Sequence, residues 1–365
     1  MRSIRPVLSL AVLATAAVAF APTPPPVATP DAQADNAWLA YDGVLNSAHR
    51  GGAFEAPENT LFAFREAMLR GADQLETDVA FTADGEIVVI HDTTVDRTTD
   101  GSGAVADLTL AEVQALDAAY CFEPGGYRDC KVPLDDDTYP YRGVRTGEVA
   151  PPAGYTADWF RIPTLREVLE TFPGVPLNVE IKATNDPRVD QGAATAVAEL
   201  LQEYDRSDDV IVVSFDDTIV LGFKANAPEI STAPGLGQGA AYVASAQGPA
   251  PGAPGFSEVH DVLQFPRSQS GVDVVTEDLV ADAHAGGLAV HVFTIDDRDV
   301  MDGLADIGVD SIMTNRVELL EQVLTEADLA YVTPAALVPP CPNAADPALG
   351  GGGCNLRAYA PGAFG

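Results

Sequence analysis

Lysine is nearly absent from this chain, and basic residues in general are scarce. Its 365 residues include 20 lysines and arginines against 54 aspartates and glutamates, a formal net charge of −34. Lysine occurs only at positions 131, 182 and 224. Such a chain repels nucleic acid and anionic membrane surfaces, so the sequence argues against a nucleic-acid partner. An anionic substrate would need a locally positive pocket.

Long hydrophobic runs are also absent beyond the amino terminus. Arg2 and Arg5 precede a mostly apolar run over residues 7–20, and Pro-rich sequence follows. This layout is typical of a secretory signal peptide, and the run is too short to span a bilayer. We expect residues 1–30 to be a signal peptide and leader. The mature protein should then be secreted or periplasmic, without a stable membrane anchor.

Cysteines are few, and their spacing forms no metal-binding motif of the CxxC kind. An exported chain reaches an oxidising compartment, where cysteines pair. Three pairings are possible among Cys121, Cys130, Cys341 and Cys354. We favour the two local ones, Cys121–Cys130 and Cys341–Cys354, as structural crosslinks.

Strand-like and helix-like segments alternate from residue 44 to residue 325. Strands separated by helices predict a parallel sheet, and about eight of them favour a (β/α)8 TIM barrel over an open sheet. Periodicity lapses over 121–160, which predicts a disulfide-containing insertion. Residues 237–255 are predicted as a Gly-, Ala- and Pro-rich connection. A linker over 31–43 and a Pro- and Gly-rich carboxyl-terminal extension over 326–365 would flank the barrel.

Two predicted strands carry acidic residues on one face. In QLETDVAF (74–81) and PLNVEIKA (176–183) apolar and polar residues alternate, and residues two apart share a face. One strand with such alternation is usually half solvated. Within a barrel, however, one face meets the helices and the other meets the barrel axis. The inward residues would therefore be Glu76, Asp78, Glu180 and Lys182.

Histidines stand at the ends of two predicted strands. His49 ends the first, and His91 ends the third. Active sites of such barrels lie at the carboxyl ends of the strands. We therefore expect both imidazoles at the same mouth as the acidic residues.

The acidic residues predict a bound cation. Three crowded carboxylates would repel one another and take up protons unless positive charge lies among them. A divalent cation bound through oxygen ligands meets this need. With no cysteine and no HxH pair, the ligand set favours Mg²⁺ or Ca²⁺ over Zn²⁺.

Charge at the predicted mouth points to an anionic substrate. Glu58 and the three acidic residues outnumber Arg50 and Lys182 by two charges, which one divalent cation neutralises. Arg offers a planar fork and Lys a point charge for phosphate oxygens. Two histidines can act as base and acid in phosphodiester cleavage.

Eight short motifs stand in a fixed order between about residue 46 and residue 324. They are HRGG (49–52), PENT (57–60), ETDVAFTADGEIVVIHD (76–92), DRTTDGSG (96–103), IPTLREVLE (162–170), NVEIK (178–182), AHAGGLAVHVFTID (283–296) and GVDSIMTNR (308–316). In sequence and order these motifs resemble the glycerophosphodiester phosphodiesterase family, and the secretory signal suggests a secreted bacterial type.

The resemblance implies a (β/α)8 phosphodiesterase that hydrolyses glycerophosphodiesters to sn-glycerol 3-phosphate and an alcohol. In many members a glycerol hydroxyl is thought to attack first, which gives a cyclic phosphate that water opens. The implied metal ligands are Glu76, Asp78 and Glu180, with Glu58 as a further ligand or a contact of one. The implied acid–base pair is His49 and His91, and the implied phosphate contacts are Arg50 and Lys182.

Phe293 departs from the family pattern, which often has Trp at this position near the glycerol. Phe keeps the apolar face but lacks the indole N–H, so affinity or head-group preference could differ. We expect Phe293 to contact the substrate.

Two other functions remain possible. A phosphodiesterase acting on lysophospholipids or phosphatidylinositol would need an apolar rim at the mouth. A non-catalytic, acidic, metal-binding exported protein would be expected to lack a ligand or a histidine, whereas every matched position is present. The sequence leaves open the alcohol, the choice between Mg²⁺ and Ca²⁺, and the oligomeric state.

Overall fold

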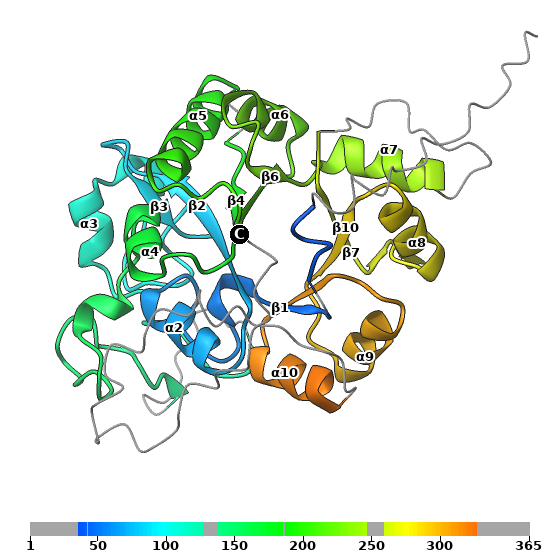
Figure 1. Ribbon diagram of the computed structural model, residues 1–365. Helices are drawn as coiled ribbons and strands as arrows, with labels where there is room; N and C mark the ends of the chain where they lie inside the picture. The colour runs from blue at the N-terminus through cyan, green and yellow to red at the C-terminus, as the bar shows by residue number, and fades with distance from the viewer. Residues whose placement is uncertain (1–35, 42, 127–137, 185–186, 247–258, 327–365) are drawn as a thin grey trace, which may run out of the picture.

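A nearly closed barrel of eight parallel strands with helices around it forms the centre of the molecule (Figure 1). The computed structural model describes residues 36–41, 43–126, 138–184, 187–246 and 259–326. The barrel strands are β1 (Leu45–Ala48), β2 (Gln74–Phe81), β4 (Leu177–Ile181), β5 (Val210–Val213), β6 (Ser231–Thr232), β7 (Val262–Pro266), β10 (Ala289–Phe293) and β11 (Ser311–Thr314). Their order is β6-β5-β4-β2-β1-β11-β10-β7, which confirms the predicted TIM barrel.

Helices follow most of the barrel strands and cover them on the outside (Figure 1). They are α2 (Leu61–Leu69), α3 (Leu110–Ala115), α4 (Leu165–Thr171), α5 (Pro187–Glu203), α6 (Asp217–Asn226), α7 (Leu236–Ala246), α8 (Glu277–Ala285), α9 (Arg298–Asp306) and α10 (Val317–Glu326). Helix α7 occupies the first part of the Gly-, Ala- and Pro-rich stretch 237–255, where the sequence predicted no helix, and the rest of that stretch lies outside the described residues. Its glycines have low helix propensity, but Tyr242 and Val243 pack against the core beside α8, and this packing outweighs propensity.

The predicted alternation along the strands separates two environments. On β2, Leu75 and Val79 are buried in the main apolar core, which the strands share with α2, α4 and α5. Glu76 and Asp78 are buried too, but on the inward face. Period-two alternation thus sends the acidic residues to the barrel axis.

The predicted third strand, β3 (Ile87–Val89), is not a barrel strand. It runs antiparallel to β2, with Val79 opposite Val89 and Phe81 opposite Ile87. The chain reverses at Gly85, whose φ of 86° favours glycine. The prediction that His91 ends a parallel barrel strand is therefore wrong. His91 still lines the pocket, but it arrives there by a different route. Instead, β3 runs back along β2 and brings it level with Asp78, whose carbonyl accepts the backbone N–H of Ile90 at 2.9 Å.

The two ends of the strand order meet at Thr232 on β6. Its carbonyl accepts the backbone N–H of Asp261 at 3.2 Å, and its hydroxyl lies 2.9 Å from Nδ1 of His260. These bonds join β6 to the residues just before β7. They explain how the barrel closes although the two strands do not pair along their length.

Residues 36–41 pack against the amino-terminal end of the barrel. Trp38 is 1% exposed, and Asn36 Nδ2 donates to the carbonyls of Asp261 and Gly287, both at 2.8 Å. The apolar partners of Trp38 are Leu45, Ile211, Ala233, Val262 and Ala289. This part of the predicted 31–43 linker contributes to the barrel core.

The described part of the predicted insertion packs beside α2. Rings of Tyr141 and Tyr155 lie 4.9 and 4.7 Å from the ring of Phe62, centroid to centroid, and Phe160 stacks on it at 4.5 Å. The short 3-10 helix η4 (Ala157–Phe160) ends this region. These tyrosines therefore form an aromatic cluster against α2.

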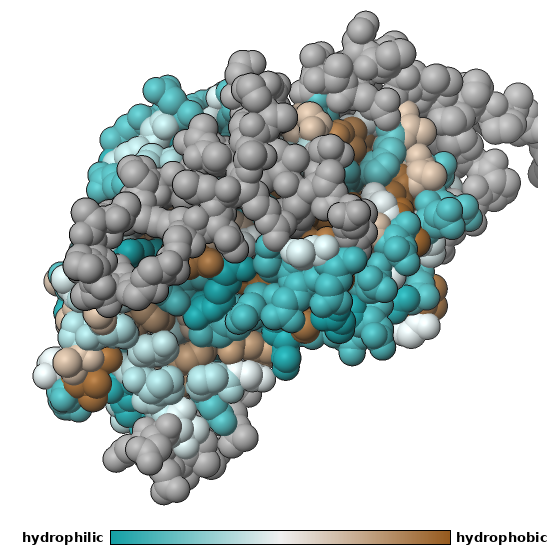
Figure 2. Space-filling view, turned by 60° about the horizontal axis from the view of Figure 1, so that its bottom comes forward, coloured by the Kyte–Doolittle hydropathy of each residue, from teal (hydrophilic) through white to brown (hydrophobic). Residues whose placement is uncertain are grey.

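Several predicted features fall outside the described residues. These are the signal peptide, the carboxyl-terminal extension, and Cys130, Cys341 and Cys354, so export and the cysteine pairing stay predictions. Within the described ranges, no helix combines the length and apolar character needed to cross a membrane. The described surface in Figure 2 is mostly hydrophilic, as the excess of acidic residues leads one to expect.

Candidate active site

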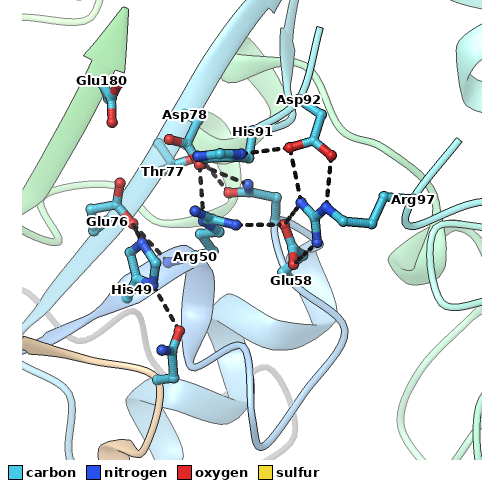
Figure 3. Close-up of polar contacts among 12 residues, drawn as sticks. His49, Arg50, Glu58, Glu76, Thr77, Asp78, His91, Asp92, Arg97 and Glu180 are labelled. Carbon is cyan, nitrogen blue, oxygen red and sulfur yellow. Dashed lines mark hydrogen bonds and ion pairs between the residues drawn. The ribbon is translucent and has the colours of Figure 1, made fainter. Parts of the chain in front are cut away.

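Three carboxylates converge inside the barrel, and all three come from β2 and β4 (Figure 3). The strands are parallel neighbours with Asp78 opposite Glu180, so Glu76 and Asp78 on one strand face Glu180 on the next. One oxygen from each residue lies within 4.8 Å of the others. The structure thus brings together the three predicted metal ligands.

Charge crowding shifts the protonation of these acids in opposite directions. Burial, and then the neighbouring charge of Asp78, raises the pKa of Glu76 well above its ordinary value. For Asp78, burial would raise the pKa, but Lys182 and Arg50 outweigh it and lower the pKa to about 2. Crowded carboxylates of this kind are stabilised by a positive charge among them. The donor set therefore fits a divalent cation bound through oxygen.

Lys182 lies between two of these acids. Its Nζ is 2.7 Å from Asp78 Oδ1 and 2.7 Å from Glu180 Oε1. Burial alone would lower the pKa of Lys182, but the two carboxylates outweigh burial and raise it. The lysine is therefore positively charged at the edge of the acidic cluster, where a phosphate oxygen could meet it.

His49 follows β1 in a short 3-10 turn, η1 (His49–Gly51). Its Nδ1 lies 2.7 Å from the amide oxygen of Asn315, whose own Nδ2 donates to Asp296 at 2.7 Å. Its Nε2 lies 4.0 Å from Glu76 Oε2. Burial, and then the charge of Arg50, lowers the pKa of His49 to about 4. The ring is therefore neutral at pH 7, with its proton on Nδ1 and Nε2 able to accept one.

Arg50 has a left-handed backbone, with φ 54° and ψ 29°. This conformation aims its backbone N–H at Glu76 Oε2 (2.8 Å) and its Nε at Asp78 Oδ2 (3.4 Å). The next residue, Gly51, also has positive φ, and a Cβ there would lie 2.8 Å from the Cβ of Ala63. These requirements explain the glycine at position 51 of the HRGG motif.

Asn59 in the PENT motif supports the same carboxylates from the other side. Its backbone is left-handed (φ 56°), and its Nδ2 donates to Asp78 Oδ2 at 3.1 Å. Its Oδ1 accepts the hydroxyl of Thr77 at 3.0 Å. Asn59 therefore orients Asp78 without adding charge.

A chain of ion pairs joins His91 to Arg50 (Figure 3). His91 Nδ1 lies 2.6 Å from Asp92 Oδ1, and Arg97 Nε lies 2.6 Å from Asp92 Oδ2. Arg97 also binds both oxygens of Glu58, at 2.7 and 2.8 Å. Glu58 Oε1 in turn accepts from Arg50 Nη1 at 3.2 Å. Glu58 thus contacts the two arginines, and its pKa is lowered because Arg97 and Arg50 outweigh burial.

An open pocket of about 550 Å³ lies beside the acidic residues and this chain of ion pairs. Its lining residues are His91, Asp92, Thr93, Thr94, Glu180, Lys182, Ala183 and Phe215. Phe215 is 49% exposed, and its ring meets that of Phe293 edge-on at 6.2 Å. The pocket is therefore lined by charged side chains and by the aromatic ring of Phe215, against which Phe293 packs.

Sequence reasoning assigned no role to five residues that the structure places here. Asp92, Arg97, Asn59 and Asn315 all stand in the motifs quoted for the family resemblance, but their contacts depend on segments far apart in the chain. Phe215 follows β5, whose carboxyl end lies at the mouth. This position in the sequence could have indicated that Phe215 lines the site. Arg97 and Asp92 add one charge of each sign, so the predicted charge balance at the site is unchanged.

Comparisons with known proteins agree with this geometry. Residues 49–319 match the model of the glycerophosphoryl diester phosphodiesterase family. The chain belongs to this family. A glycerophosphodiester phosphodiesterase of Caldanaerobacter subterraneus is 32% identical over 277 residues, which cover 76% of this chain and 96% of that protein.

Solved structures share the fold. A candidate glycerophosphoryl diester phosphodiesterase of Silicibacter pomeroyi superposes with a TM-score of 0.62 at 24% identity, over 82% of this chain and 99% of that chain. A phosphodiesterase of Oleispira antarctica, solved with its product sn-glycerol-3-phosphate, superposes with a TM-score of 0.58 at 24% identity. That match covers 79% of this chain and 99% of that chain. At this identity these neighbours support the barrel and nothing finer.

Proposed function

We propose that this family member is an exported, metal-dependent enzyme that hydrolyses glycerophosphodiesters to sn-glycerol 3-phosphate and an alcohol. The observation that carries the proposal is the convergence of three carboxylates, two of them buried, beside two histidines, each with its Nδ1 next to a hydrogen-bond acceptor. Family membership and the 32% identity to the Caldanaerobacter subterraneus glycerophosphodiester phosphodiesterase support the substrate class.

Glu76, Asp78 and Glu180 would hold one divalent cation, Mg²⁺ or Ca²⁺. When bound, the cation would neutralise phosphate oxygens and stabilise charge that develops on them. The Arg50 guanidinium and the Lys182 ammonium would bind the same phosphate. They already lie within 3.4 Å of the acidic cluster.

The two histidines would carry the two proton transfers. His49 is neutral at pH 7, because its pKa is about 4, and its Nε2 would accept a proton from the attacking hydroxyl. His91 lies against the Asp92 carboxylate, which orients its ring. Its Nε2 would donate a proton to the departing alcohol oxygen. The attacking hydroxyl would be that of the glycerol or of water.

The exposed ring of Phe215 favours a substrate with an apolar portion. Phe215 and Phe293 meet edge-on beside the pocket, and Phe215 is half exposed. A lysophospholipid or phosphatidylinositol substrate would use such a surface. Comparing turnover of glycerophosphocholine with that of lysophosphatidylcholine decides between the two substrate classes.

The test is a panel of glycerophosphodiesters assayed with Mg²⁺, with Ca²⁺ and after EDTA treatment, with alcohol and glycerol phosphate measured separately. We expect equal release of both products and loss of activity in EDTA. Asp78→Asn should be inactive, whereas Asp208→Asn, which changes an exposed acid, should match wild type. Undiminished activity of the metal-stripped enzyme would contradict the metal requirement. Activity on no diester would contradict the function itself.

Export can be tested separately. The chain expressed from its full sequence should appear outside the cytoplasm in a form shortened at its amino terminus. A full-length protein retained in the cytoplasm would exclude the signal peptide.

A further inference from the structure

Arg97 contacts two acidic residues that belong to different parts of the site. Its Nη1 and Nη2 bind both oxygens of Glu58, and its Nε binds Asp92 Oδ2 with Nη2 3.2 Å from Asp92 Oδ1. Guanidinium and carboxylate match in such paired geometry, so these contacts fix orientation as well as distance. Glu58 precedes α2, whereas Asp92 follows β3. Arg97 therefore ties together two segments that approach the mouth separately.

One of these contacts reaches His91. Asp92 Oδ1 lies 2.6 Å from His91 Nδ1, and an ionised carboxylate can only accept a hydrogen bond. Nδ1 must therefore carry a proton, which leaves Nε2 for chemistry. Asp92 is partly exposed, with its side chain 29% accessible. Arg97 is the residue that holds both of its oxygens in place.

The other contact reaches Arg50. Glu58 Oε1 is shared between Arg97 Nη2 at 2.8 Å and Arg50 Nη1 at 3.2 Å. Because Arg97 compensates most of the charge of Glu58, Arg50 keeps its contact with Asp78 instead of pairing fully with Glu58. Loss of Arg97 would leave Glu58, which is 8% exposed, with Arg50 as its main counter-charge. Arg50 would then turn away from the phosphate position.

We propose that Arg97 is a positioning residue that aligns His91, through Asp92, and Arg50, through Glu58, at the same time. The inference rests on the proposed function and names a residue for it that touches neither substrate nor metal. It predicts that one substitution disturbs proton transfer and phosphate binding together.

The test compares Arg97→Met with Arg166→Met. Arg166 binds both oxygens of Glu203 at 2.7 and 2.9 Å, but on the outer surface between α4 and α5. Met keeps the length of the side chain and removes the fork. Because small displacements of catalytic groups are costly, we expect Arg97→Met to lower kcat about 10- to 100-fold and to raise KM. Arg166→Met should match wild type.

A second measurement separates this proposal from the function on which it rests. Nitrogen-15 NMR of the histidine rings reports the tautomer whether or not substrate is turned over, and a His91→Gln spectrum assigns the signal. Wild type should show His91 protonated on Nδ1. Arg97→Met and Asp92→Asn should show a mixture of tautomers, and Arg97→Lys an intermediate state.

Two outcomes would overturn the proposal. One is a folded Arg97→Met enzyme with kcat and KM within about twofold of wild type. The other, which applies even if Arg97→Met does not fold, is an unchanged His91 tautomer in both Arg97→Lys and Asp92→Asn. An inactive wild type with the expected tautomer shift would reject the proposed function while leaving the alignment by Arg97 intact.

Discussion

At the scale of single residues, the two candidate catalytic histidines share one arrangement. In each, Nδ1 faces an acceptor, Asn315 for His49 and Asp92 for His91, and Nε2 is left for proton transfer. The acceptor is neutral in one case and charged in the other. The two rings therefore meet different electrostatic surroundings while keeping the same orientation relative to their acceptors.

Asn315→Leu should therefore lower kcat about tenfold, since the orienting hydrogen bond of His49 is worth about 1.4 kcal/mol or less. The measurement is steady-state kinetics on glycerophosphocholine. Asn226→Leu, which changes an exposed amide on α6, serves as the control. An Asn315→Leu enzyme that is folded and fully active would mean that the ring needs no such support.

Phe215→Ala should weaken substrate binding without changing proton transfer. The Phe215 ring lines the pocket and packs edge-on against Phe293. A contact between an aromatic ring and a bound group contributes about 0.5–1.5 kcal/mol. We expect KM to rise about 2- to 10-fold with kcat nearly unchanged. Leu221→Ala, on an exposed position of α6, is the matched control. A large fall in kcat at constant KM would place Phe215 in the chemistry instead.

At the scale of elements, short polar motifs decide where helices begin. Thr164 and Glu167 form a capping box at the start of α4, in which each side chain binds the other's backbone N–H. Thr109 and Glu112 form the same box on α3. The first lies in the helix layer beside the strands that carry the acids, and the second lies on the exposed surface.

Thr164→Ala should cost more stability than Thr109→Ala, because the first cap is buried. Loss of a cap costs about 1 kcal/mol, within a range of about 0.5–2. Urea unfolding measures both, and kcat should stay unchanged in both variants. Equal small losses would show that burial does not strengthen the α4 cap.

The direction of strand β3, and not only its presence, decides where His91 lies. Its apolar residues Ile87 and Val89 predict a strand, but they do not state which neighbour it joins. Antiparallel pairing with β2 follows from the tight turn at Gly85. That turn delivers His91 to the level of Asp78, which a ninth parallel strand would not have done.

At the scale of the whole molecule, buried histidines couple stability to pH. Burial lowers the pKa of His260 to about 4 and that of His291 to about 3, from an ordinary value of 6.5. As pH falls below 6.5, the unfolded chain binds protons that the folded chain does not, so stability falls. Each such histidine contributes about 1.4 kcal/mol per pH unit until its folded pKa is reached.

Replacing His291 by Met should make the loss of stability between pH 6.5 and 4 shallower. The variant lacks one group that binds a proton in the unfolded chain but not in the folded chain over this range. Urea unfolding at several pH values measures this slope. His284→Gln should leave this slope unchanged, and should remove a loss of stability that the wild type shows as pH rises above 6.5. Its hydrogen bond to Asp310 raises its pKa, so it stabilises the fold below pH 6.5 and this stabilisation is lost as pH rises through the folded pKa. Parallel curves for wild type and His291→Met would contradict the prediction.

By itself the sequence determined the barrel and the acidic centre. Both follow from local regularities: alternation sends Glu76, Asp78 and Glu180 inward, and repeated strand–helix units lead to parallel pairing in register. The tertiary structure alone decided that Arg97 reaches Glu58, 39 positions away, and that Asn315 reaches His49, 266 positions away. Periodicity describes which face a side chain occupies. Contacts between distant segments depend on the path of the loops, and that path is decided only when the whole chain packs.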